Sequence, residues 1–144
     1  SAAEAELGAR FATLEDLLSS SDFVTLNCPL TAQTTGLIGE RQLALMKPGA
    51  FLINVARGPV VDADALYDAL ASRRIAGAAL DVTAPEPLPR GHRLLTLENL
   101  VITPHLGSAS DRTRRRMIEM TVENLQAGLA GKPLPWQVLP RPTP

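Results

Sequence analysis

Four short, strongly apolar runs separated by helix-like segments constrain the fold of this 144-residue chain more than any other feature. An apolar run of strand length without polar alternation is typical of a strand buried on both faces, and such strands occur in parallel sheets whose connections are helices. We therefore expect an α/β fold in which helices cover both faces of a parallel sheet. The expected strands span residues 23–27, 50–55, 75–82 and 100–103.

The segments between these runs carry helix signals. Thr13 and Asp62 are favourable N-cap residues, because a side-chain oxygen at that position accepts a hydrogen bond from a backbone N–H of the first turn. Ser108 is expected to cap a long helix that has Leu125 in its core-facing stripe and stops before Gly131. The expected helices span residues 13–18, 40–46, 62–72 and 108–130.

Composition and charge exclude several classes of protein. With 45% hydrophobic residues and a net charge of −1, the chain resembles an ordinary globular protein and gives no support for a nucleic-acid or membrane-surface partner. We expect neither a membrane span nor a secretory leader, because no apolar run approaches about 20 residues and no basic segment precedes one. The single cysteine, Cys28, cannot form an internal disulfide, which fits a reducing compartment such as the cytoplasm. We expect no metal site.

Three chemically active side chains follow the ends of expected strands. Arg57 follows the run AFLINV, Glu86 lies in the loop after IAGAALDV, and His105 follows NLVIT. Because ligands bind beyond the carboxyl ends of the strands of a parallel sheet, these three groups are expected to meet in one cleft.

The three groups together suit the reversible reduction of a 2-oxo acid. An arginine fork binds a planar carboxylate with two hydrogen bonds, and a histidine can give a proton to a carbonyl oxygen near neutral pH. A carboxylate on the other ring nitrogen holds the imidazole in one tautomer, while the hydride must come from a cofactor. Each residue alone also has a structural interpretation: Arg57 as an ion-pair partner, Glu86 as a rim carboxylate, His105 as a loop residue, and Asp81 as a loop cap or a ligand.

Three motifs together, in this order and spacing, resemble the NAD(P)-dependent D-2-hydroxyacid dehydrogenases. They are NVARGPVVDADALYDAL, IAGAALDVTAPEPLP and NLVITPHLGSAS, and the resemblance extends over about residues 10–133. It implies a Rossmann-type domain and, from the segment DVTAPEPLPRGHRLLTLENLVITPHLGSAS, reduction of glyoxylate or hydroxypyruvate to the D-2-hydroxy acid.

The resemblance implies a role for each residue of the catalytic set. Arg57 matches the residue that binds the substrate carboxylate and carbonyl, His105 matches the general acid/base, and Glu86 matches its carboxylate partner. Ser108 matches a residue of the turn that faces the substrate.

Cofactor contacts are implied in the same way. Pro29, Val55, Asp81 and Gly107 match positions beside the bound dinucleotide. The resemblance implies NAD(P)H, with NADPH slightly favoured, a small-molecule 2-oxo acid as the substrate, a homodimer for the complete enzyme, and a cytoplasmic location.

The chain also departs from the family pattern. It contains no Gly-rich turn for a pyrophosphate and no residue that selects NAD or NADP. We therefore expect residues 1–131 to be the C-terminal half of the dinucleotide-binding domain and residues 132–144 to be a Pro-rich tail. The expected strand 23–27 then lies at an unpaired edge, so the isolated chain is predicted to be poorly stable or self-associating, and incomplete for activity.

Three other interpretations remain open at this point. Transcriptional corepressors of the same fold keep similar arginine, glutamate and histidine positions, so a non-catalytic, cofactor-binding interaction protein is one alternative. An inactive truncated product is the second. A dehydrogenase of the same family acting on D-lactate, phosphoglycerate or phosphite is the third.

Overall fold

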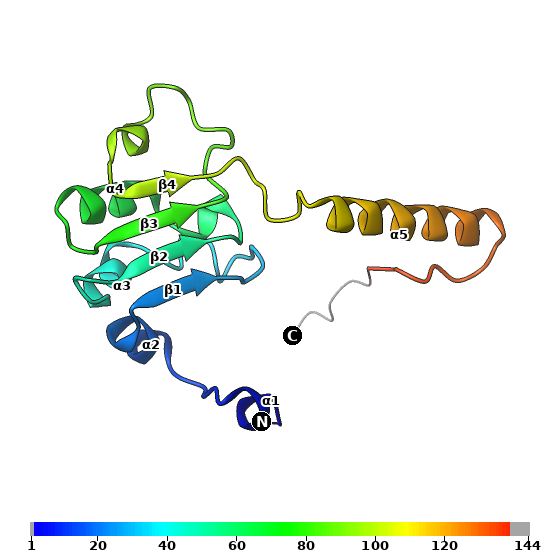
Figure 1. Cartoon of the computed structure of the whole chain (residues 1–144), viewed down its shortest axis with the longest axis horizontal. Helices are drawn as coiled ribbons and strands as arrows, with labels where there is room; N and C mark the ends of the chain where they lie inside the picture. The colour runs from blue at the N-terminus through cyan, green and yellow to red at the C-terminus, as the bar shows by residue number, and fades with distance from the viewer. Residues whose placement is uncertain (1, 139–144) are drawn as a thin grey trace. The chain divides into compact units, whose positions relative to one another are not determined.

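The computed structural model describes residues 2–138 and divides the chain into two compact units, Ser1–Pro104 and His105–Pro144 (Figure 1). The predicted boundary between domain and tail, at residue 131, is not tested by this division and stays a prediction.

A parallel sheet of four strands forms the first unit, as predicted. The strands are β1 (Phe23–Leu26), β2 (Phe51–Asn54), β3 (Gly77–Leu80) and β4 (Leu100–Ile102), and they pair in the order β1-β2-β3-β4. All three pairings are parallel. Each strand is shorter than predicted, because apolarity marks every buried residue whereas the ladder includes only those that pair. Ala50 and Ile75, for example, are fully buried but precede their strands.

The helices of the first unit begin where the local chemistry predicts. The Thr13 hydroxyl accepts from the backbone N–H of Asp16 at 3.1 Å, and the Asp62 carboxylate accepts from those of Asp64 and Ala65 at 3.0 and 3.1 Å. Both predicted N-caps are confirmed. The helices are α1 (Ala2–Leu7), α2 (Leu14–Ser20), α3 (Glu40–Leu45) and α4 (Ala63–Ala71), with short 3-10 turns η1 (Gly58–Val60) and η2 (Arg93–Thr96).

The core lies on one face of the sheet only. Helices α2, α3 and α4 pack beside one another in that order, and alternate strand residues such as Val24, Leu52 and Leu80 are buried. Within the first unit the helices cover this one face, and coverage of the second face by helices stays a prediction. Apolarity of a strand reports what the strand can bury, but which face is covered depends on where the helices pack.

The second face of the sheet is apolar and is left exposed by the rest of the first unit. We call it the open sheet face; Phe23 is 70% exposed there and Val101 61% exposed. The Phe23 and Phe51 rings stack at 5.5 Å between centroids. Because β1 pairs with β2 alone, its outer edge carries no partner strand among residues 2–138, as predicted. The predicted self-association through that edge stays a prediction.

The second unit is built on α5 (Asp111–Leu129). Its N-cap is Ser110, whose hydroxyl accepts from the backbone N–H of Thr113 at 3.2 Å, so the prediction that Ser108 caps this helix is wrong. The reason is a preceding turn, closed by a hydrogen bond from Ala109 N–H to the carbonyl of Leu106, which delays the helix start by two residues.

The carboxyl end of α5 follows prediction, whereas its apolar side does not. Gly131 adopts a φ of +65° just beyond the helix, the conformation that favours glycine at a helix end. Leu125 is exposed, so its prediction as a core residue is wrong for the described part of the chain. The segment that follows returns along the helix: Trp136 N–H donates to Oδ1 of Asn124 at 2.9 Å, and the Arg116 guanidinium lies 4.7 Å from the Trp136 ring centroid. Residues 139–144 of the predicted tail lie outside the described residues.

Candidate active site

Arg57 lies just beyond the carboxyl end of β2, as predicted. Its backbone is extended, with φ −143° and ψ 145°, and its side chain is exposed. Nη1 donates to the carbonyl of Ala56 at 2.6 Å. Because a guanidinium carries five N–H donors, this bond does not use up its capacity to bind a carboxylate.

Asn54 shapes the turn that carries Arg57, and it was not among the site residues predicted from sequence. It is only 1% exposed, and its Nδ2 donates to the carbonyl of Arg57 while its Oδ1 accepts from the N–H of Ala56, both at 3.0 Å. A buried amide side chain requires such partners, because an unsatisfied one is costly. The available signal was a lone polar residue at the end of the apolar run AFLIN.

Asp81 lies at the corresponding end of β3. Its backbone N–H donates to the carbonyl of Asn54 at 2.9 Å, which continues the ladder one step past the strand. Its Oδ1 accepts from the hydroxyl of Thr103 at 2.6 Å, which links it to the end of β4. The carboxyl ends of β2, β3 and β4 therefore bring Arg57, Asp81 and Thr103 to one edge of the sheet.

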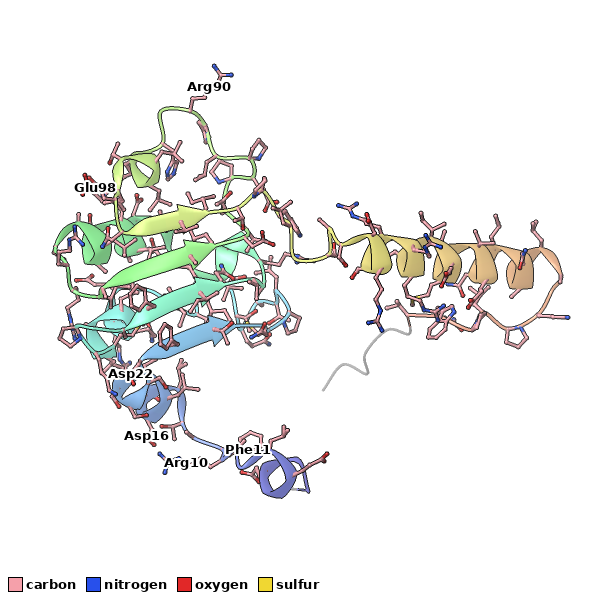
Figure 2. All side chains as sticks on the ribbon, in the orientation of Figure 1. Arg10, Phe11, Asp16, Asp22, Arg90 and Glu98 are labelled. Atoms are coloured by element: carbon pink, nitrogen blue, oxygen red, sulfur yellow. The ribbon has the colours of Figure 1, made fainter. Side chains whose placement is uncertain are left out.

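Glu86 lies in the loop that follows β3, and its side chain is exposed. The backbone N–H of Thr83 approaches Oε2 of Glu86 at 3.4 Å, and the Thr83 hydroxyl donates to the carbonyl of Pro85 at 2.9 Å. Figure 2 shows Arg90 at the outer tip of this loop, pointing away from the sheet, whereas Asp22 and Glu98 lie at the opposite end of the strands. Because its loop leaves the carboxyl end of β3 and contacts the turn after β2, Glu86 lies on the carboxyl side of the sheet, as predicted.

The loops of Arg57 and Glu86 touch through a glycine. A Cβ added at Gly58 would lie 2.0 Å from the carbonyl oxygen of Thr83 and 2.7 Å from the nitrogen of Ala84. Real Cβ atoms do not approach backbone so closely, so only glycine allows this contact. Sequence reasoning missed this role of Gly58, because it depends on a contact across 25 residues of chain.

Two of the predicted cofactor contacts also lie at this end of the first unit. Val55 follows β2 directly and is 44% exposed, whereas Val24 in β1 is 3% exposed. Pro29 is exposed in the loop after β1, and its carbonyl accepts from the hydroxyl of Thr34 at 2.7 Å. Exposed apolar side chains suit the flat face of a ring, but the described residues include no Gly-rich turn between a strand and a helix for a pyrophosphate.

His105, Gly107 and Ser108 belong to the second unit. His105 is exposed and has a φ of +55°, in the left-handed region that costs an L-residue about 1–2 kcal/mol. Such strain persists where the surroundings hold it, and it is concentrated at functional sites. Because His105 and Arg57 lie in different compact units, the meeting of His105 with Arg57 and Glu86 stays a prediction.

Other kinds of site find no support in residues 2–138. No three His, Cys, Asp or Glu side chains of this range are grouped so that they could hold a metal ion. No helix within it is long and apolar enough to cross a membrane.

Comparison with known proteins decides the family. Residues 1–107 match the family described as "D-isomer specific 2-hydroxyacid dehydrogenase, NAD binding domain". The chain belongs to this family. The predicted family and its Rossmann-type α/β fold are therefore confirmed, and the matched part is the family's NAD-binding domain.

Two proteins that are similar to the chain are named as glyoxylate reductases. The chain is 51% identical over 131 residues to human "Glyoxylate reductase/hydroxypyruvate reductase", which covers 91% of the chain and 40% of that protein. It is 54% identical over 129 residues to "Glyoxylate reductase" of Korarchaeum cryptofilum, covering 90% of the chain and 39% of the relative. The chain thus spans about 40% of the length of these relatives.

A solved structure agrees with this assignment. The D-lactate dehydrogenase with NAD+ from Lactobacillus jensenii superimposes with a TM-score of 0.86 at 32% identity, over 95% of this chain and 45% of that one. The likeness supports the Rossmann-type fold of the chain.

Proposed function

We propose that this chain supplies the substrate-binding and proton-transfer side chains of an NAD(P)H-dependent reductase that converts glyoxylate or hydroxypyruvate to the D-2-hydroxy acid. The observation that carries the proposal is the placement of Arg57, exposed and extended beyond the carboxyl end of β2, with Asp81 at the end of the neighbouring strand. The names of the 2-oxo acid reductases to which the chain is about half identical support the choice of substrate.

Arg57 binds the substrate in this proposal. Its guanidinium holds the carboxylate through two parallel N–H···O bonds and so orients the adjacent carbonyl group. Orientation of a bound substrate supplies a large part of an enzyme's rate enhancement, because the encounter becomes intramolecular. Ser108 lies in the turn assigned to the substrate by family resemblance.

His105 transfers the proton. Its imidazolium donates a proton to the ketone oxygen, and the Glu86 carboxylate accepts a hydrogen bond from the other ring nitrogen and holds the tautomer. The reduced nicotinamide, when bound, supplies the hydride for the carbonyl carbon. One hydride on carbon and one proton on oxygen give the 2-hydroxy acid, and the reverse transfer is its oxidation.

Residues at the carboxyl ends of β1, β2 and β3 border the cofactor in this proposal. Pro29 and Val55 offer exposed apolar contacts, and Asp81 and Gly107 complete the set implied by the family. We further propose NADPH as the preferred cofactor, a homodimer as the complete enzyme, and the cytoplasm as its location, in agreement with a single half-buried free cysteine.

Hydroxypyruvate-dependent loss of NADPH absorbance tests the proposal. The chain is assayed alone and in place of the matching 129 residues of the K. cryptofilum glyoxylate reductase. We expect turnover at least in the chimera. His105→Ala should lower kcat by about 10²- to 10⁴-fold, and Arg57→Lys should raise KM, because lysine cannot bind a carboxylate as a fork.

The unaltered K. cryptofilum glyoxylate reductase is the control for both assays, that of the chain alone and that of the chimera. A folded chimera that shows no turnover while the parent is active would contradict the proposal, and so would a His105→Ala chimera with unchanged kcat. Turnover in the chimera but not in the isolated chain would support the site and show that activity needs residues beyond these 144.

A further inference from the structure

The strand that leads to Arg57 ends in a polar side chain whose burial needs an explanation. Asn54 is 1% exposed and is the buried polar residue among the core side chains of the first unit's described part. Both polar atoms of its amide group are engaged: Nδ2 donates to the Arg57 carbonyl and Oδ1 accepts from the Ala56 N–H, both at 3.0 Å. A leucine would fill the same space but would make neither bond.

The backbone of Asn54 is itself held by the sheet. It pairs with Leu80 in the ladder between β2 and β3, and its carbonyl accepts from the N–H of Asp81 at 2.9 Å. Ala56 and Arg57 lie past the last paired residue of β2, so they have no ladder bond of their own. The Asn54 side chain therefore extends the order of the sheet to these two residues.

The next residue is held from the other side. Gly58 lies against the backbone of Thr83, too close for any side chain, and the N–H of Thr83 points to the Glu86 carboxylate. Arg57 is thus the exposed residue between an amide bridge on one side and a backbone contact on the other.

We infer that Asn54 is a positioning residue for Arg57. It does not touch the substrate; it sets the path of the Arg57 backbone and thereby the place where the guanidinium meets a carboxylate. The inference deepens the proposed function and rests on it for the identity of the ligand. If Asn54 had only a structural role, its variants would weaken ligand binding only in proportion to the stability that they remove from the fold.

Oxalate is the probe, because it is a planar dicarboxylate similar in shape to a short 2-oxo acid. Its binding to the ¹⁵N-labelled chain is followed at the Arg57 Nε–H resonance. We expect Asn54→Leu to weaken binding by about tenfold or more. Asn54→Asp serves as a second variant if the leucine chain does not fold, because it keeps the acceptor for Ala56 but loses the donor to Arg57. Asn54→Asp should shift the Arg57 resonance and weaken oxalate binding, while the Ala56 N–H stays protected from hydrogen exchange.

A matched control exists in the same sheet. Nδ2 of Asn99 donates to the carbonyls of Leu70 and Ala76 at 3.2 and 3.3 Å, so it also bridges backbone groups, but next to the start of β3. Asn99→Leu should lower the urea midpoint while leaving the oxalate affinity and the Arg57 resonance unchanged. In an Arg57→Ala background, Asn54→Leu should have no further effect on oxalate binding, because the effect runs through Arg57.

Amide hydrogen exchange separates this inference from the proposed function. If the unaltered chain binds no oxalate, the ligand assignment fails for this chain, but the positioning claim is still decided by the Ala56 N–H. That amide should be protected in the unaltered chain and in Asn99→Leu, and should exchange at least tenfold faster in Asn54→Leu. Unchanged exchange and an unchanged Arg57 resonance in Asn54→Leu would overturn the inference, as would equal losses of oxalate affinity in the Asn54 and Asn99 variants.

Discussion

Helices α4 and α5 have similar sequence signals but different surroundings. Each begins at a side-chain N-cap and carries an apolar stripe. Helix α4 buries Leu66, Ala69 and Leu70 against the sheet and its neighbours, whereas α5, with 19 residues, buries none among the described residues. An amphipathic pattern shows what a helix can bury, but most of a helix's stability in a protein comes from the packing it finds.

The largest expected difference between the two helices is at their leucines. Leu66→Ala in α4, where the side chain is 1% exposed, should lower the free energy of unfolding by about 2–5 kcal/mol, because it leaves a cavity in the core. Leu129→Ala in α5, where the side chain is 81% exposed, should change it by less than about 0.5 kcal/mol. Urea titration followed by circular dichroism measures both. A loss of more than 2 kcal/mol in the α5 variant would show that α5 packs as firmly as α4.

The Gly58–Thr83 contact extends the comparison to the loops of the first unit. Gly58→Ala should destabilise the chain by about 1–3 kcal/mol, because the backbone of Thr83 must move to admit a methyl group. Gly49→Ala is the matched control, since no atom lies within 4 Å of its added Cβ. Thermal unfolding of the two variants should differ clearly; equal midpoints would mean that the two loops are not in firm contact.

Removing the N-caps compares the two helices at their first turns. Asp62→Ala should lower the free energy of unfolding of the first unit by about 1 kcal/mol, because the N–H groups of Asp64 and Ala65 lose their acceptor. Ser110→Ala should lower the helical signal of α5 without shifting the main unfolding transition. A coincident shift in both variants would indicate that the two helices unfold as one cooperative body.

The smallest effect is expected at the exposed ion pairs of α5. Arg116 contacts Glu119 and Glu123 at 3.2 and 3.4 Å, and it lies over Trp136. Because these groups are close to half exposed, Arg116→Gln should change stability by less than about 1 kcal/mol, and less still in high salt. Trp136 fluorescence should report the change locally. A loss above 2 kcal/mol would show that the returning segment stabilises the whole unit.

Short-range chemistry was predictable from the chain alone. Thr13 and Asp62 cap helices because their acceptors reach N–H groups two or three residues away, and Gly131 ends α5 because few other residues adopt a positive φ. The positions of Arg57 and Asp81 at the carboxyl ends of strands follow from the apolar runs that precede them. Ser108 was misassigned as a cap because a competing turn, also local, delayed the helix.

Contacts between distant segments were not predictable in the same way. The bridge from Asn54 to Arg57 is local, but its importance appears only when the burial of Asn54 is known. The approach of Gly58 to Thr83 joins two loops, and the strained φ of His105 depends on how the chain leaves β4. No repeating pattern of residues in the sequence indicates any of these features.

The sequence by itself determined the α/β class, the family, the helix caps at Thr13 and Asp62, and the residues that follow each strand. These depend on hydrophobic period and on hydrogen bonds within a few residues. Only the tertiary structure decided that the helices of the first unit pack on one face of its sheet, that Asn54 is buried behind Arg57, and that α5 buries no residue within the second unit's described part. The physical reason is that a side chain is buried only when another segment packs on it, and the sequence does not show which segment that is.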